Sequence, residues 1–399
     1  MVNARLIYID GPSSAKNEIS KIGAYEASLP IMYPKAIHLT MKLEGVSVEA
    51  AGIIKQEMLS KGGEAAVNKD VCRFQVDKSD MLLMGTYSQY KKLIQKLELQ
   101  PWTMKEIAAE IKEVLEGVDK GKPASFECGK FSLPIGEKTY IMGILNVTPD
   151  SFYDGGKYTE LEAAVKKAKE MVEEGADIIE VGGQSFKPGY TTISAEEEIE
   201  RVVPVVEKLA KELNVPISVD TCKFQVAEKV LQAGAHIIND VWGLQKEKKI
   251  AELVHEYSAG IILMHNQEHC EYKDLMGDIL KYLRNSIKIA ENAGVKKYQM
   301  ILDPGIGFTF GKNLEQHFEI MKKLKELNSL NLPVMLAPSR KKFIGDFLGI
   351  PVEERLGATI STIVVGISNG IDIIRVHDIK EMKYVTKITD RMVRSEENV

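Results

Sequence analysis

The chain is poor in cysteine, carries little net charge and has no long uninterrupted apolar run. Its 4 cysteines, in 399 residues, are scattered and include no C-x-x-C pair. This pattern favours reduced thiols over a disulfide framework, so we expect a cytoplasmic protein. The net charge is −5 at pH 7, which gives no overall attraction for nucleic acid or anionic membranes. Any anionic ligand must therefore be bound by a local cluster of basic residues.

Segments that could enter a membrane are also missing. The first residues, MVNARLIYIDG, lack a basic region that leads into a long apolar stretch, so we predict no signal peptide. The most apolar late segment, Ile360–Ile374, is interrupted by Ser361, Ser368, Asn369 and Asp372, too soon for a membrane span. We therefore expect a protein that binds neither nucleic acid nor membrane.

The sequence changes character once along its length, which is too great for one ordinary core. Residues 1–117 are predicted to form a small α/β domain, followed by a Gly-, Pro- and Lys-rich linker at 118–125 and a second domain at 126–399. In the first domain, helices are predicted at Ser47–Ser60 and Lys105–Leu115 and strands at Val71–Val76 and Met81–Gly85. The sequence assigns this domain no role.

From residue 126 onward, short apolar strands alternate with amphipathic helices, as in parallel β/α units. The predicted strands are Tyr140–Leu145, Ile178–Val181, Ile217–Val219, Ile237–Ile238, Ile261–Met264, Met300–Leu302, Val334–Leu336 and Ile373–Val376. The helices predicted between and after them include Leu161–Glu174, Glu196–Leu213, Gln225–Ala233, Leu314–Leu327 and Lys380–Met392. This rhythm predicts a (β/α)8 TIM barrel, with an open doubly wound sheet as the alternative. The hairpin-like stretch Phe126–Ile135 is expected to plug the barrel floor.

Nearly every predicted strand ends in a hydrogen-bonding or charged side chain. Any one of them alone is explained equally well as a helix N-cap or a solvated loop residue. In a barrel, however, the carboxyl ends of all strands meet at one mouth, where active sites lie. Three of the strand ends carry side chains that could pair with a flat heterocycle bearing amino and ring N–H groups. They are the carboxylates Asp220 and Asp303 and the amide Asn239. The last two strands lead to cations where barrels often bind phosphate: Lys341, Arg375 and His377.

Over residues 126–399 the sequence resembles the dihydropteroate synthase family. The motif MGILNVTPDSF at 142–152 is specific to that family. Supporting motifs follow in family order: SVDT (218–221), INDV (238–241), LMH (263–265), LDPGIGF (302–308), SRK (339–341) and RVHD (375–378). The resemblance implies that 6-hydroxymethyl-7,8-dihydropterin diphosphate is condensed with p-aminobenzoate, with Mg²⁺ assisting, to give 7,8-dihydropteroate and pyrophosphate in folate biosynthesis. Because related barrels commonly pair, it also implies a homodimer.

The resemblance also implies roles for single residues. The pterin would be bound by Asp220, Asn239, Asp303, Phe308 and Lys341. Three of these would be catalytic: Asp220, Asp303 and Lys341. The diphosphate would be bound by Asn146, Lys187, Arg375 and His377, with Asn146 facing the metal ion. Ser185, Phe186 and Lys342 would belong to the acceptor site.

The second loop of the barrel departs from the family pattern. The family usually has GGESTRPG, whereas residues 182–189 read GGQSFKPG, and Glu180 stands where an aspartate is usual. Lys187 keeps a positive charge without the bidentate fork of arginine. Phe186 removes a hydroxyl and adds bulk where the second substrate would enter.

Several interpretations of this loop stay open. It is a variant that still catalyses, it accepts a different arylamine, or the protein binds a pterin without turning it over. A methyl-folate-binding methyltransferase is a further alternative, because such enzymes share the pterin-binding Asp and Asn residues. NVTPDSF and the cations Lys341, Arg375 and His377 speak against it.

Overall fold

The computed structural model describes residues 2–101, 103–147, 157–184, 193–307 and 311–394. The expectations for Ser185, Phe186, Lys187 and Phe308 lie outside the described residues. The chain divides into two compact units, Met1–Gly121 and Lys122–Val399. Each unit is described by itself.

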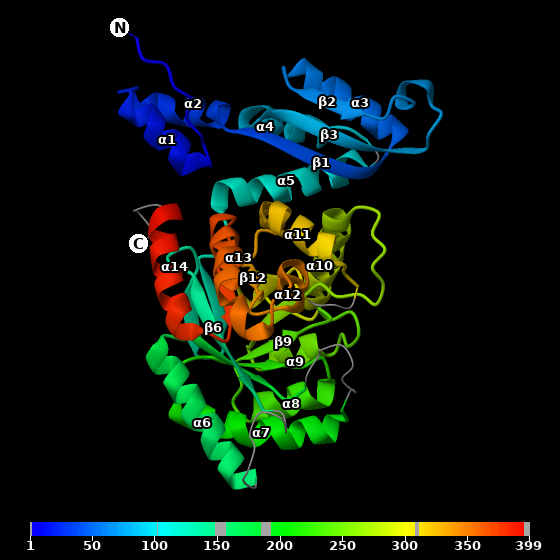
Figure 1. Cartoon of the computed structure of the whole chain (residues 1–399). Helices are drawn as coiled ribbons and strands as arrows, with labels where there is room; N and C mark the ends of the chain where they lie inside the picture. The colour runs from blue at the N-terminus through cyan, green and yellow to red at the C-terminus, as the bar shows by residue number, and fades with distance from the viewer. Residues whose placement is uncertain (1, 102, 148–156, 185–192, 308–310, 395–399) are drawn as a thin grey trace. The chain divides into compact units, whose positions relative to one another are not determined.

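The first unit packs helices against a three-stranded antiparallel sheet of order β1-β3-β2 (Figure 1). Its strands are β1 (His38–Ser47), β2 (Glu64–Val67) and β3 (Lys78–Thr86). Its helices are α1 (Pro12–Lys21), α2 (Leu29–Ala36), α3 (Val48–Ser60), α4 (Tyr87–Leu97) and α5 (Met104–Lys120), with 3₁₀ turns η1 (Glu26–Ser28) and η2 (Val71–Arg73). Ile54, Leu83 and Tyr90 are fully buried in its core.

Three of the four elements predicted in this unit are confirmed, and one is wrong. The predicted strand Val71–Val76 is instead the turn η2, followed by Phe74 in the left-handed region at φ 54°. The side chain of Asn68 accepts a hydrogen bond from Asp70 N at 2.9 Å, a local bond that competes with strand pairing. Helix α5 continues to Lys120, so the first residues of the expected linker are helical.

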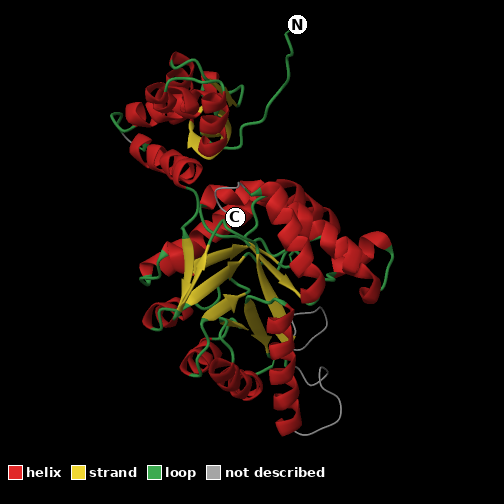
Figure 2. Ribbon diagram, turned by 90° about the vertical axis from the view of Figure 1, so that its left-hand side faces the viewer, coloured by secondary structure: helices red, strands yellow, loops and turns green. Residues whose placement is uncertain are grey.

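The second unit is a closed barrel of eight parallel strands, which confirms the TIM barrel and excludes the open sheet (Figure 2). The strand order is β11-β10-β9-β8-β7-β6-β13-β12, and a bridge between Leu302 and Val334 closes the ring. The strands are β6 (Tyr140–Asn146), β7 (Ile178–Gly182), β8 (Ile217–Asp220), β9 (Ile237–Asp240), β10 (Gly260–Met264), β11 (Met300–Asp303), β12 (Met335–Leu336) and β13 (Ile373–Val376).

Helices surround the barrel and cover the outward-facing side chains of its strands (Figures 1 and 2). They are α6 (Lys157–Glu174), α7 (Ala195–Glu212), α8 (Phe224–Gln232), α9 (Ile250–Glu256), α10 (Leu275–Asn292), α11 (Leu314–Lys323), α12 (Lys342–Leu348), α13 (Leu356–Ser368) and α14 (Ile379–Val393), with 3₁₀ segments η4 (Lys297–Gln299), η5 (Leu324–Leu330) and η6 (Val352–Arg355). The helix predicted at Leu314–Leu327 therefore tightens into a 3₁₀ segment after Lys323. In the described part of the chain, no helix has the length and apolar character to cross a bilayer.

A hairpin fills the floor of the barrel, at the amino-terminal ends of its strands, as predicted. It consists of β4 (Ser125–Cys128) and β5 (Phe131–Pro134). Phe126 is fully buried in a cluster with Met142 of β6 and the inward isoleucines of β7, β9, β10, β11 and β13. A Cβ built on Gly260 would lie 2.4 Å from Cζ of Phe126, so only glycine fits beneath this ring.

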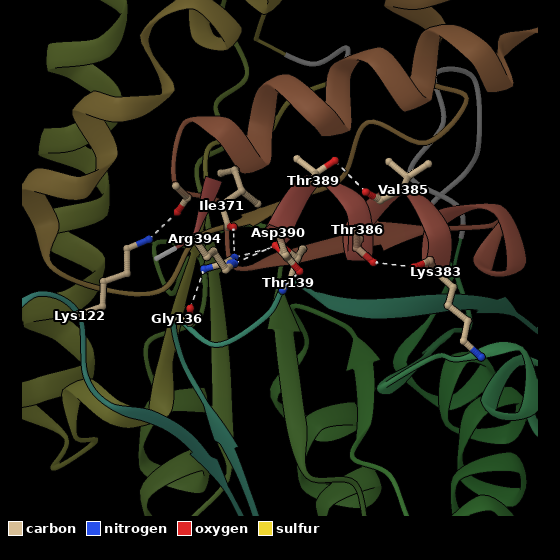
Figure 3. A network of polar contacts seen from close by, with 11 residues as sticks. Lys122, Gly136, Thr139, Ile371, Lys383, Val385, Thr386, Thr389, Asp390 and Arg394 are labelled. Carbon is tan, nitrogen blue, oxygen red and sulfur yellow. Dashed lines mark hydrogen bonds and ion pairs between the residues drawn. The ribbon is translucent and has the colours of Figure 1, made fainter. Parts of the chain in front are cut away.

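Polar contacts join the end of α14 to the start of β6 (Figure 3). Asp390 accepts hydrogen bonds from the backbone N–H and the hydroxyl of Thr139, at 2.8 and 2.7 Å. Arg394 donates to Asp390 at 2.8 Å and to the carbonyl oxygens of Gly136 and Ile371, each at 3.2 Å. These bonds fix the last β/α unit against the first and stabilise the closed ring.

Candidate active site

Side-chain alternation along the strands places a polar layer directly above the apolar floor. Ile178, Ile237, Ile301 and Ile373 point inward into the floor cluster. Because successive side chains of a strand point to opposite faces, the residues two positions later also point inward. These are Glu180, Asn239, Asp303 and Arg375, and strand register places Asp220 beside Asn239. The structure thus brings together four of the predicted site residues from β8, β9, β11 and β13.

An ion-pair network crosses this layer. Glu180, which the sequence offered only as a departure from the family pattern, is fully buried and forms a short ion pair with Nε of Arg375. Nη2 of Arg375 lies 3.2 Å from Oδ2 of Asp220. The other oxygen of Glu180 accepts a hydrogen bond from Nδ2 of Asn239 at 2.7 Å. Oδ1 of Asp220 and Oδ1 of Asn239 remain buried with no hydrogen-bond partner among the described residues. Such atoms are rare in proteins, and a ligand with N–H donors would satisfy them.

Burial also changes the acidity of the carboxyl groups. Burial, followed by the charge of Glu180, raises the pKa of Asp220 to about 8. Burial raises the pKa of Asp303 to about 6, although Oδ1 of this residue accepts a hydrogen bond from Gly305 N at 2.7 Å. Perturbed carboxyl groups gathered in one layer are typical of functional sites.

Two lysines lie at this mouth, one predicted and one missed. A Cβ on Gly307 would lie 2.6 Å from Cγ of Lys341, so Lys341 packs directly on the turn that follows β11. Burial, followed by the charge of Arg375, lowers the pKa of Lys341 to about 8. Lys312, which no sequence motif marked as a site residue, is 4% exposed, and burial lowers its pKa to about 7. The sequence feature that could have identified Lys312 is its place between Gly311 and the helix-capping Asn313, close behind the LDPGIGF motif.

The loops after β12 and β13 are joined by Arg340, another residue that the sequence did not single out. Its guanidinium donates to both carboxylate oxygens of Asp378, at 2.9 and 2.7 Å. Ser339 contacts Nδ1 of His377 at 3.0 Å. The prediction that His377 adds a cation is wrong: burial, followed by the charge of Arg375, lowers the pKa of His377 to about 4. His377 is therefore a neutral hydrogen-bonding group at neutral pH.

Two further predicted residues are exposed. Asn146, at the end of β6, lies beside Gly182, where a Cβ would be 3.5 Å from its Oδ1. Nζ of Lys342 lies 3.5 Å from Oδ2 of Asp346, one turn later in α12, so Lys342 is paired within its own helix.

One lysine, Lys223, contacts the residues on either side of the segment 185–192 of the second loop. Nζ of Lys223 donates to Oε1 of Gln184 at 2.9 Å and to the carbonyl oxygen of Ile193 at 2.8 Å. It also forms a 2.6 Å ion pair with Glu198 of α7, which is almost completely buried. Because Glu198 neutralises the lysine, the neutral Gln184 suffices as an acceptor where the family usually has an acid.

A resident metal site is not visible in the part of the chain that the structure covers. Among those residues, no group of three or more His, Cys, Asp or Glu side chains is placed to hold a metal ion. The mouth instead supplies single oxygen donors, such as Asn146, on which an ion bound to a substrate could rest.

Comparison with known proteins gives a consistent result. Residues 142–377 match the model of the family described as pterin binding enzyme. The chain is 50% identical over 267 residues to a dihydropteroate synthase of Clostridium beijerinckii (67% of this chain, 98% of the relative) and 50% identical over 257 residues to that of Bacillus subtilis (64% and 90%). A probable bifunctional folylpolyglutamate synthase/dihydropteroate synthase of Halobacterium salinarum is 35% identical over 96% of this chain and 46% of its own length.

Solved structures show the same likeness. A dihydropteroate synthase from Clostridium difficile, in the presence of pteroic acid, has a TM-score of 0.64 and 47% identity, over 65% of this chain and 99% of that one. The Xanthomonas albilineans enzyme with 4-aminobenzoic acid has a TM-score of 0.63 and 34% identity, over 67% and 98%.

Proposed function

The chain belongs to the pterin-binding enzymes and is a transferase of the dihydropteroate synthase family, and we propose how its barrel mouth performs that reaction. The substrates are 6-hydroxymethyl-7,8-dihydropterin diphosphate and p-aminobenzoate, and the products are 7,8-dihydropteroate and pyrophosphate. The observation that carries the proposal is a pair of buried acceptors that have no partner within the described part of the chain, Oδ1 of Asp220 and Oδ1 of Asn239.

The pterin head binds in the polar layer. Its amino and ring N–H groups donate to Asp220, Asn239 and Asp303, and the buried Oδ1 atoms of Asp220 and Asn239, which have no partner among the described residues, support this assignment. Lys341 packs on Gly307. We assign Lys341 to this pocket, together with Phe308, on the family motif. The apolar floor cluster beneath this layer excludes water from below.

The diphosphate binds at the rim, where charge must be neutralised. Arg375 and His377, from β13 and the loop that follows it, donate hydrogen bonds to the phosphate oxygens, together with Lys187 and Asn146. Mg²⁺ is suited to this place, because it commonly binds through one or two protein oxygens plus substrate phosphates and water. When bound, it would supply further charge neutralisation on the leaving group, with Asn146 as its protein contact.

The chemistry is mainly positioning and electrostatics. The bond between the methylene carbon and the diphosphate oxygen breaks, and Arg375 stabilises the negative charge of the departing pyrophosphate. Asp220 and Asp303 stabilise the positive charge left on the pterin methylene. The amine of p-aminobenzoate forms the new N–C bond and then loses one proton to water. An aromatic amine is already nucleophilic, so holding both substrates in line is the main requirement.

The acceptor binds beside the second loop. We assign Ser185 and Phe186 to this part of the site, with Lys342 available on the exposed start of α12. Lys223 supports the assignment because it holds Gln184 and Ile193, the residues that bracket 185–192.

Pyrophosphate release tests the proposed function. The purified protein is supplied with the pterin diphosphate and Mg²⁺, with and without p-aminobenzoate. Release that depends on p-aminobenzoate, together with formation of dihydropteroate, is expected. Pterin binding without acceptor-dependent turnover would show that a different arylamine is used or that activity is lost. Methyl transfer from a methyl-folate, without pyrophosphate release, would instead support a methyltransferase.

We further propose that the protein is a homodimer. Tyr384, Ile388 and Met392 recur every four residues along α14 and are 67%, 59% and 66% exposed. An apolar stripe of this kind is typical of an association surface, and two copies can bury it symmetrically. Sedimentation of Ile388→Glu is expected to show a monomer where the wild-type protein is a dimer. We also assign the reaction to the cytoplasm, which the four free thiols support.

A further inference from the structure

Glu180 lies at the centre of the hydrogen-bond and ion-pair network of the polar layer. It lies on β7, has no exposed surface, and contacts side chains from three other strands. Its carboxylate accepts a hydrogen bond from Nδ2 of Asn239 on β9 at 2.7 Å and lies 3.5 Å from Oγ of Ser218 on β8. Its second oxygen pairs with Nε of Arg375 on β13. A buried charge of this kind is costly unless it is fully paired, and here each oxygen has a partner.

The contact with Asn239 determines which way that amide faces. An ionised carboxylate only accepts hydrogen bonds, so the atom of Asn239 nearest to it must be the NH₂ group. The carbonyl Oδ1 then points away from Glu180, and it is this buried oxygen that has no partner among the described residues. If the amide of Asn239 were reversed, its Oδ1 would face an oxygen of Glu180. Its NH₂ group, a donor, would then occupy the position that faces the ligand. The neighbouring charge therefore makes Asn239 an acceptor toward the ligand.

The contact with Arg375 acts on the same side of the pocket. Nε of Arg375 pairs with Glu180, while its Nη2 lies 3.2 Å from Oδ2 of Asp220. Because Oδ2 of Asp220 contacts the arginine, Oδ1 is the oxygen that none of the described residues engages. One carboxylate thus fixes the cation, and the cation fixes the orientation of the second carboxylate.

We propose that Glu180 is a positioning residue that sets the hydrogen-bonding polarity of the heterocycle pocket: it orients Asn239 as an acceptor and, through Arg375, leaves Oδ1 of Asp220 facing the ligand. The pocket then selects a heterocycle edge that carries N–H donors. That this heterocycle is a dihydropterin rests on the proposed function. The arrangement of acceptors is observed in the structure independently of that function.

Binding of the isolated head group tests the proposal. The probes are 6-hydroxymethyl-7,8-dihydropterin, which occupies only the heterocycle pocket, and pyrophosphate, which occupies only the rim. Their dissociation constants are measured by calorimetry with full-length wild-type protein and with Glu180→Gln, Glu180→Asp and Asp372→Asn.

Asp372 provides a matched control at the other end of the barrel. It is 3% exposed, accepts a hydrogen bond from Val334 N at 2.9 Å and pairs with Lys122 at 2.6 Å, so its removal also disrupts a buried acid. We expect Asp372→Asn to lower the melting temperature and leave head-group affinity unchanged. At a pH above the acid limb of wild-type binding, where Asp220 is ionised in both proteins, Glu180→Gln, which lets Asn239 reverse, should weaken head-group binding about tenfold or more. Glu180→Asp keeps the charge on a shorter side chain and should bind with intermediate affinity.

A pH profile separates positioning from a general loss of structure. The charged groups that face Asp220 are Glu180 on β7, Arg375 on β13, Glu198 on α7 and Lys341 before α12. The charge of Glu180 raises the pKa of Asp220, so its removal should lower that pKa. Because the ionised form of Asp220 accepts the ligand N–H, the acid limb of head-group binding is expected at lower pH in Glu180→Gln than in wild type.

The outcomes are distinct. Wild-type affinity for the head group in Glu180→Gln, or an equal loss of affinity in Asp372→Asn, would overturn the positioning role while the proposed function stands. A melting temperature close to that of wild type for Glu180→Asp establishes that the intermediate affinity is not due to unfolding. Absence of head-group binding by the wild-type protein would overturn the proposed function and this inference with it.

Discussion

Asp220 is buried beside another carboxyl group, an environment that disfavours its ionised form. Burial and the neighbouring Glu180 raise its pKa to about 8, so the folded protein binds this proton more tightly than the unfolded chain does. Its contribution to stability is complete below the unfolded pKa, near 4, and is lost as the pH rises through about 8. The site therefore stores free energy that ligand N–H groups can recover, as is common in active sites.

The first prediction concerns Asp220→Asn. Because the amide cannot ionise, the variant is expected to gain stability relative to wild type as the pH rises from about 6.5 to 8, by on the order of 1–3 kcal/mol, while losing pterin binding. Thermal unfolding of both proteins across this range measures the difference. Lys312 and Lys341 also titrate near here, at about 7 and 8, but they are present in both proteins. A stability difference that does not change with pH would show that Asp220 is ionised throughout.

The second prediction concerns Lys223, which links Gln184, Ile193 and Glu198. Lys223→Met removes all three contacts and should reduce kcat/KM about 10-fold to 100-fold, mainly through the acceptor, because the ends of the second loop are no longer fixed. Lys169→Met, which breaks a half-exposed 2.6 Å pair with Glu212 on the outer helices, is the control. Equal activity of the two variants would show that Lys223 has only a structural role.

Among the barrel strands, the inward side chains form two layers: an apolar layer that stabilises the fold and a polar layer that forms the candidate site. The inward layer nearest the amino-terminal ends is apolar, and the next layer carries Glu180, Asn239, Asp303 and Arg375. The two layers alternate with outward residues that pack on the helices. Substitutions in the floor are therefore expected to change stability, and substitutions in the polar layer to change binding.

The third prediction concerns the hairpin of β4 and β5. Phe126→Ala empties a fully buried position beneath Gly260 and should lower the free energy of unfolding by about 3–5 kcal/mol. Activity at low temperature should stay close to wild type, because the ring lies one layer or more below the polar residues. Denaturant unfolding and initial rates check this. A loss of pterin affinity without a loss of stability would contradict it.

At the scale of the whole molecule, the first unit has its own apolar core and the barrel has another. The Clostridium beijerinckii and Bacillus subtilis relatives match only 67% and 64% of this chain, over 98% and 90% of their own lengths. The Halobacterium salinarum relative matches 96% of this chain, so a counterpart of the first unit is present there.

The fourth prediction follows from these two cores. Residues 122–399 alone are expected to fold and to retain kcat/KM within about threefold of the full chain. Lys122 is kept because it pairs with Asp372 of the barrel. Circular dichroism melting and steady-state rates of this fragment test the expectation. A folded fragment without activity would mean that the first unit contributes directly to the reaction.

The barrel could be predicted from the order of residues alone, because apolar strands and amphipathic helices have distinct periods along the chain. Each predicted barrel strand was confirmed, although β9 continues to Asp240 and β11 to Asp303. Local patterns also pointed to Asp220, Asn239, Asp303 and Arg375, since each comes at a strand end. The predicted strand at Val71–Val76 was wrong, because its apolar residues do not reveal that Asn68 and Asp70 form a turn beside them.

The interactions among these residues could not be predicted before the strands were assembled in space. Glu180 and Arg375 are 195 positions apart, yet they form a buried ion pair, and Glu180 fixes the amide of Asn239. The neutral state of His377 and the lowered pKa of Lys341 arise from burial and from charges on other strands. Hydrogen-bond orientation and ionisation depend on distances between side chains and on the exclusion of water, and neither is encoded in the order of residues along one strand.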